Sequence, residues 1–315
     1  MIRKLAPALA GALFASTAAA QVPPPPKLVV LLVVDQLSGD LFEQYRPNFG
    51  EGFARIASGT AFRNGSEAPG PALGDLVKAR APGSRNVDVS GEKSQVSDAL
   101  SGRNLDQRWY WNANKFDTDV RGARVPAVVP KVNAAIAAAL GQPRPPLEPT
   151  SFCKSKPSKT QLARRAGDAA GLSASPELDG GTLALAAGLA DEMQLGRRAD
   201  PDVMTIELSA TANVVRTYGP GSQEACLQLT ELDREIGDFL SLLDSREIDY
   251  AVALQGGGGA PIPILLWRPG FRGATVAAPA STADLTATLA TLIDIPLANS
   301  SGHCLEGTPA FCQQR

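Results

Sequence analysis

The hydrophobic pattern is strongest at the start of the chain, where seven apolar residues run without interruption from Leu28 to Val34 and end at Asp35. An unbroken, valine-rich run of this length is typical of a central strand in a parallel sheet, buried on both faces. In open α/β folds the ligand crevice lies at the carboxyl ends of the strands, so Asp35 is a candidate functional residue. The alternative is that Asp35 only caps the segment that begins at Ser38.

The rest of the chain alternates between segments of helical and of strand character. Two short helices are expected within 40–57, and single helices over 75–80, 125–140, 175–195, 222–243 and 282–293. Strands are expected over 86–90, 202–209, 249–254 and 262–267, and a hairpin over 106–116. This alternation predicts an α/β fold, a doubly wound, mostly parallel sheet with helices on both faces.

The first residues have the layout of an export signal. Residues 1–20 combine basic Arg3 and Lys4, a short apolar stretch and small residues ending in Ala20, so we expect a cleavable signal peptide. Residues 21–26 then form a proline-rich spacer, and residues 27–315 a single α/β domain. No stretch reaches the roughly 18 apolar residues that a membrane span needs, so we expect an exported protein, periplasmic or secreted.

Charge and cysteine content narrow the function classes. With 30 basic against 32 acidic residues and no basic stripe, nucleic acid is not an expected partner. The four cysteines are an even number without a CxxC pair, and in an exported chain they indicate disulfides. The short spacing of Cys304 and Cys312 favours a local bridge, which leaves Cys153 with Cys226; other pairings stay open.

Four segments carry a family resemblance: VVDQLSGDLFEQYRPNF, DQRWYW, SPELDGGTLALAAGL and LSATANVVRTYG, in this order along the chain. Together they resemble bacterial exported alkaline phosphatases of the threonine-nucleophile type, which are close to nucleotide pyrophosphatase/phosphodiesterases. The resemblance implies an alkaline-phosphatase-like core, here lacking insertions. It also implies descent from a phosphomonoesterase in which three Asp and three His hold two zinc ions beside a threonine nucleophile.

Of the implied metal ligands only Asp35 has a match, as the aspartate after the first strand. The family motif resembling SATDxxxHTYG reads SATANVVRTYG here, so Ala212 and Arg216 occupy the two ligand positions. A methyl group cannot ligate, and a guanidinium repels a dication. The nucleophile loop expected after Gly65 is absent. We therefore interpret Asp35 as a vestigial metal ligand, with Arg216 able to pair with it, and expect no catalytic residue in register.

The remaining elements of the site also depart from the family. Gln255 and the glycines of 256–259 replace an expected Asp-His pair, and we interpret the glycines as a tight connection rather than a phosphate cradle. The chain's single histidine, His303, lies in a tail segment that implies no ligand role.

The phosphate-binding motif resembling SGKDRA reads SGEKSQV, which places Glu92 and Ser94 where lysine and arginine are expected. Lys93 is recovered only by a shift of one residue. We therefore interpret Lys93 as a solvated charge at the start of a helix rather than as part of an anion site.

Three hypotheses remain. The first is a degenerate alkaline phosphatase without catalysis, which needs no cofactor and binds a phosphate ester or an envelope ligand; its partners stay unknown. The alternative is an active metal-dependent phosphomonoesterase or phosphodiesterase with a rearranged zinc site that uses unmatched groups such as Asp75, Asp88 or Glu207. The chain has one histidine and scattered carboxylates, which cannot supply the three or so ligands that each zinc ion needs, so the non-catalytic hypothesis is favoured. The third is a decayed or internally deleted gene copy.

Overall fold

The computed structural model describes residues 24–122, 124–270, 273–295, 302–305 and 312. The predicted signal peptide over 1–20 and the first three residues of the predicted spacer lie outside this part. From residue 24 the chain leads directly into the first strand, and among the described residues no helix is both long and apolar enough to cross a membrane.

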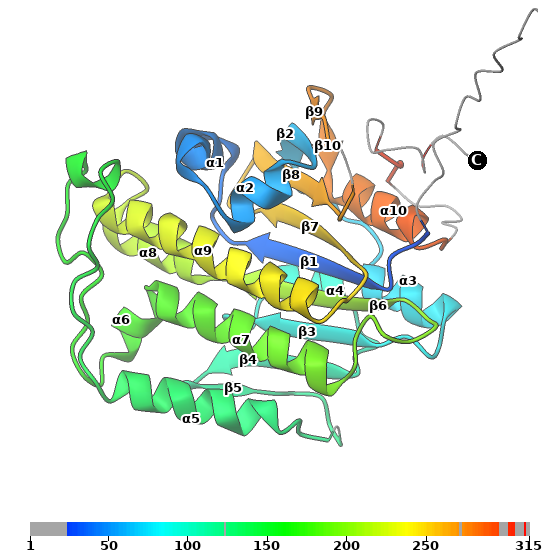
Figure 1. The fold of residues 1–315 in the computed structure, drawn as a ribbon, viewed down its shortest axis with the longest axis horizontal. Coiled ribbons are helices and arrows are strands. Elements are labelled where there is room, and N and C mark those ends of the chain that lie inside the picture. The colour runs from blue at the N-terminus through cyan, green and yellow to red at the C-terminus, as the bar shows by residue number, and fades with distance from the viewer. Residues whose placement is uncertain (1–23, 123, 271–272, 296–301, 306–311, 313–315) are drawn as a thin grey trace, which may run out of the picture.

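A ten-stranded sheet forms the centre of the described structure, with the order β10-β2-β8-β7-β1-β6-β3-β4-β5 and β9 paired to β2 (Figure 1). The strands are β1 Leu28–Val34, β2 Thr60–Ser66, β3 Asn86–Ser90, β4 Gln107–Asn112, β5 Lys115–Asp117, β6 Asp202–Leu208, β7 Tyr250–Gly256, β8 Ile262–Trp267, β9 Thr275–Val276 and β10 Ala280–Ser281. The predicted α/β class with a mostly parallel sheet is confirmed.

The middle of the sheet is parallel, because β1 pairs in parallel with both β6 and β7, and β3 pairs in parallel with β6 and β4. Towards one edge, β8 runs antiparallel to β7 and to β2. The strand predicted near Ile262 is therefore present but reversed. The connection 257–261 is too short for the crossover of a dozen or more residues that a parallel neighbour needs.

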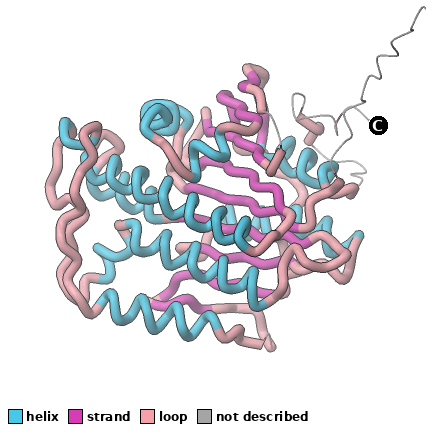
Figure 2. The backbone as a smooth tube through the Cα atoms, in the orientation of Figure 1, coloured by secondary structure: helices cyan, strands magenta, loops and turns pink. Residues whose placement is uncertain are grey.

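Helices cover both faces of the sheet (Figures 1 and 2). α3 and α4 pack with α10 on one face, while α1, α2, α5, α7 and α9 lie on the other. The helices are α1 Gly39–Tyr45, α2 Gly52–Ala57, α3 Leu73–Arg80, α4 Gln95–Ser101, α5 Val128–Leu140, α6 Ala169–Ser173, α7 Pro176–Glu192, α8 Ala210–Tyr218, α9 Gln223–Ser245 and α10 Thr282–Leu292, with 3-10 turns at Arg46–Asn48 and Cys153–Ser155.

The two-sided burial explains the uninterrupted apolar run. Val29, Leu31 and Val33 point into the core beneath α3, α4 and α10, whereas their alternate neighbours point into the opposite core. All seven residues of β1 are at most 2% exposed. A strand between two helical layers has no wet face, so polar alternation is lost.

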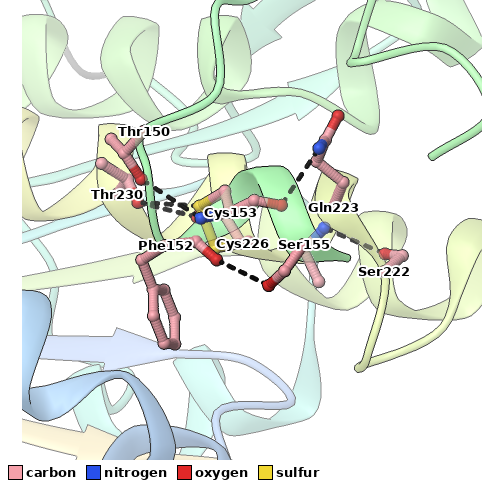
Figure 3. The surroundings of a disulfide bond; sticks show 9 residues. Thr150, Phe152, Cys153, Ser155, Ser222, Gln223, Cys226 and Thr230 are labelled. Atoms are coloured by element: carbon pink, nitrogen blue, oxygen red, sulfur yellow. Dashed lines mark hydrogen bonds between the residues drawn. A yellow bond between two sulfur atoms is a disulfide. The ribbon is translucent and has the colours of Figure 1, made fainter. Parts of the chain in front are cut away.

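The described residues contain two disulfides, Cys153 with Cys226 and Cys304 with Cys312. These are the pairs that the cysteine spacing favoured. The first ties the turn Cys153–Ser155 to α9, where Gln223 Nε2 also donates to the Cys153 carbonyl at 3.0 Å (Figure 3). Disulfides of this kind are consistent with a non-cytoplasmic protein.

Candidate functional site

Four parallel strands end together at the edge where Asp35 lies. Val34 at the end of β1 is level with Leu208 of β6 and Gly256 of β7, and Ser90 at the end of β3 is level with Glu207. The backbone N–H of Asp35 donates to the Leu208 carbonyl at 3.1 Å, which extends the ladder by one bond. The predicted position of Asp35 at the carboxyl edge of the sheet is confirmed.

Glu207 is a deeply buried acid at this edge, at 1% exposure. The Ser94 hydroxyl, at the N-cap of α4, lies 2.6 Å from both carboxylate oxygens of Glu207 and donates to that carboxylate. Burial first, and then the negative charges of Asp35, Asp88 and Glu92, raise the pKa of Glu207 to about 8, although the hydrogen bond from Ser94 lowers it. At neutral pH the protonated form of the Glu207 side chain is therefore favoured.

Asp88, two residues before the end of β3, is also buried, at 1% exposure. Its carboxylate accepts from Ser97 Oγ at 2.6 Å and from Arg108 Nε at 3.0 Å. Burial raises its pKa, while Ser97 and Arg108 lower it. Each oxygen of Asp88 thus has a protein donor, and the side chain is held in place by α4 and β4.

Arg216 lies on α8, exposed to solvent, and its guanidinium donates to Asn213 Oδ1. The predicted ion pair between Arg216 and Asp35 is not observed among the described residues. The charge of Arg216 still acts through space, because it lowers the pKa of Asp35 and of Glu92, whereas burial is the largest influence and raises both. The guanidinium of Arg216 therefore acts on Asp35 through space, without an ion pair between them among the described residues.

The other candidates are occupied or lie away from this edge. Lys93 pairs with Asp119 at 2.6 Å, as a charge at a helix start does. Asp75 accepts the N–H groups of residues 103 and 104, beside the amino end of β3. His303, with a side chain 94% exposed, lies against Asp284 near the start of α10.

The donor set does not fit a two-zinc centre. Among the described residues no group of three or more His, Cys, Asp or Glu side chains is placed to hold a metal ion. Such a centre needs about three protein ligands for each metal, and the acids near Asp35, which are Asp88, Glu92 and Glu207, are not grouped with it in that way.

Sequence reasoning named Glu207 only as an unmatched carboxylate and missed its contact with Ser94. A signal was available in β6, where DVMTIEL places acids inside a strand with burial on both faces. Glu207 and Gln255 are both level with Val33, one on each side of β1, so alternation directs all three side chains to the α3, α4 and α10 face.

Curated relatives are alkaline phosphatases. The chain is 38% identical over 204 residues to the alkaline phosphatase PhoK of a Sphingomonas species, covering 61% of this chain and 36% of that protein. It is 33% identical over 207 residues to the alkaline phosphatase PhoD of Zymomonas mobilis, covering 61% and 35%. The chain thus spans about a third of the length of these relatives. No family model matches it.

A solved structure gives the same indication for the fold. The wild-type alkaline phosphatase PafA aligns with a TM-score of 0.63 at 20% identity, over 75% of this chain and 63% of that one. At this identity the likeness concerns the fold alone. Together with the two curated relatives, this likeness supports a relationship of the chain to the alkaline phosphatase superfamily.

Proposed function

We propose that this chain is a non-catalytic, exported protein of alkaline phosphatase descent, whose former metal edge no longer holds zinc. One observation carries the proposal: Asp35, at the carboxyl end of β1, is the only family metal ligand with a match, and among the described residues it belongs to no group of three or more side chains placed to hold a metal ion. The charges that act at this edge are instead those of neighbouring acids and of Arg216. Ala212, on α8, occupies a position where the family motif has an aspartate ligand. Its side chain is buried, at 5% exposure, and offers only a methyl group.

Electrostatics at the same edge disfavour a phosphate ester. A phosphate dianion placed between β1 and β3 would meet the carboxyl groups of Asp35 and Glu92, and repulsion by Asp35 already contributes to the raised pKa of Glu92. Lys93 is paired with Asp119, and the charge of Arg216 already acts on Asp35 and Glu92. Little positive charge is therefore left to stabilise the charge that develops in phosphoryl transfer.

The N-terminal assignments belong to the same proposal. Residues 1–20 would be removed on export and 21–26 would link the cleavage site to β1, so that residues 27–315 fold as one domain. The two disulfides support an oxidising destination, periplasmic or secreted.

Turnover tests the proposal. The purified chain is assayed with chromogenic phosphate mono- and diesters, with and without added zinc, beside Asp35→Ala and the matched control Asp40→Ala, an exposed acid on α1. We expect all three proteins to give background rates. Zinc-stimulated turnover that Asp35→Ala abolishes and Asp40→Ala retains would overturn the proposal in favour of an active phosphatase with a rearranged site.

A further inference from the structure

The connection 141–168, between α5 and α6, is basic in a chain whose overall charge is near neutral. It runs along the end of the molecule at the left of Figure 1. It carries six basic residues against two acidic ones, whereas the whole chain has 30 against 32. The basic residues are Arg144, Lys154, Lys156, Lys159, Arg164 and Arg165, and the acidic ones are Glu148 and Asp168. Positive charge is thus concentrated on one connection.

Three of these cations are engaged with other parts of the protein. Arg144 and Arg164 lie 3.6 and 2.8 Å from the carboxylate of Glu177 on α7. Lys156 Nζ lies over the ring of Tyr45, 5.0 Å from its centroid. These contacts hold the connection against the helical layer and leave three cations to consider.

The other three, Lys154, Lys159 and Arg165, are exposed, and among the described residues no ion pair involves their side chains. Lys159 and Arg165 line the same cavity of about 510 Å³, between the connection, α6 and the end of α8. This volume is within the usual range for small-molecule sites, roughly 300–1,000 Å³. The apolar part of the wall consists of Leu162, Ala163, Ala174 and the side chain of Tyr218.

The backbone that carries the two cations is held in place. The N–H groups of Lys159 and Thr160 both donate to Glu224 Oε1, at 2.7 Å each, at the start of α9. The carbonyl of Arg165 accepts from the Arg164 guanidinium at 3.1 Å. A ligand therefore has to order two side chains rather than a loop, which lowers the entropic cost of binding.

Asp168 is the one acidic side chain among the described residues that line the cavity. Its carboxylate accepts from the N–H of Gly171 at 2.9 Å, and its charge raises the pKa of Arg164, so the two charges attract each other. Two cations without ion-pair partners thus outnumber one acid that already interacts with protein groups. The lining has a net charge of +1, which favours an anion over a cation.

We propose that this cavity binds a small organic anion that carries one carboxylate on a compact apolar body. The carboxylate accepts from the planar guanidinium of Arg165 and from Lys159 Nζ, and its single charge balances the lining. The apolar body packs on Leu162, Ala174 and Tyr218. The site goes beyond the proposed function, because no acid of the carboxyl edge lines this cavity and no metal is needed.

Three probes with the same ring and different charge test the ligand class: benzoate, benzamide and benzylamine, which is positively charged at neutral pH. Their affinities are measured by chemical-shift titration of the isotope-labelled chain. We expect benzoate to bind about tenfold more tightly than benzamide, with shifts at residues of the cavity, and benzylamine to bind least tightly. The affinity for benzoate should fall as salt is added, because the cations are exposed. No binding of benzoate, or an affinity no higher than that of benzamide or benzylamine, would overturn the proposal.

Variants locate the site. Lys159→Gln and Arg165→Gln each remove one cation at an exposed position, so the fold should be retained. Each should reduce the preference for benzoate over benzamide about threefold, and the double variant should abolish it. Lys154→Gln, the same change at an exposed lysine of the connection that does not line the cavity, should retain it.

An unchanged preference in the double variant, or an equal loss in Lys154→Gln, contradicts the proposal. Phosphatase turnover by the chain would overturn the proposed function but not this site, whereas a failure of benzoate to bind would leave the proposed function standing.

Discussion

At the scale of one residue, Glu207 shows the electrostatic character of the carboxyl edge of the sheet. The side chain is enclosed beneath α4, where burial and three neighbouring acids favour the protonated form and the Ser94 hydroxyl is its hydrogen-bond partner. A carboxyl group in this state contributes a hydrogen bond to the packing of α4 on β6.

The pH dependence of stability should report this state. The folded pKa of Glu207, about 8, is above its usual value of 4.5, so the folded chain binds the proton more tightly. The stabilisation is complete below about pH 4.5 and is lost as pH rises through about 8, with a slope of up to about 1.4 kcal/mol per pH unit.

Glu207→Gln should remove that slope, so that the free energy of unfolding of the variant gains on the wild type between pH 5 and 8. Denaturant titrations across this range measure it, with Glu148→Gln, at an exposed glutamate, as the control. Parallel pH profiles for wild type and Glu207→Gln would contradict the assignment.

At the scale of elements, the apolar periodicity predicted most helices and the buried strands. It missed β2, with the sequence TAFRNGS, β9 and β10, with two residues each, α4 and α6, with seven and five, and α8, with nine. α5 begins at Val128, three residues after the predicted start. Short elements bury too few side chains to show a period, and their stability comes from tertiary contacts.

The candidate site was predictable only in part. The position of Asp35 follows from one strand, because the carboxyl end of a buried parallel strand is a defined place. The contact between Ser94 and Glu207 joins residues 113 apart, and the position of Arg216 depends on a local bond to Asn213. Neither contact leaves a periodic signal in the sequence.

The disulfide between Cys153 and Cys226 gives a prediction for the connection that it closes. It joins residues 73 apart, whereas Cys304 and Cys312 are 8 apart. Because the loop-closure entropy removed from the unfolded chain grows with loop length, replacing the first pair with alanine should lower the free energy of unfolding by about 2–4 kcal/mol.

Replacing Cys304 and Cys312 with alanine is the matched control, and its effect should be smaller by about 2 kcal/mol. Unfolding by denaturant without reductant measures both variants. An equal or larger loss from the short bridge would show that the long one does not constrain the unfolded chain in this way.

For the whole molecule, a sheet between two helical layers is shared in fold with an alkaline phosphatase, and the proposed difference in function from that neighbour lies at the strand ends. The core depends on apolar burial between layers, which substitutions at the carboxyl edge leave intact. A zinc centre depends on several side chains meeting within about 2 Å of one ion, so the loss of two or three ligands removes it. Fold and activity can therefore separate in this way.

Zinc content per chain tests this account most directly. The purified chain is equilibrated with zinc, dialysed and measured by elemental analysis beside Asp35→Ala. We expect far less than one zinc per chain in both proteins, since Asp35 has too few partners to hold the ion. One or two zinc ions per wild-type chain, lost in Asp35→Ala, would contradict the account.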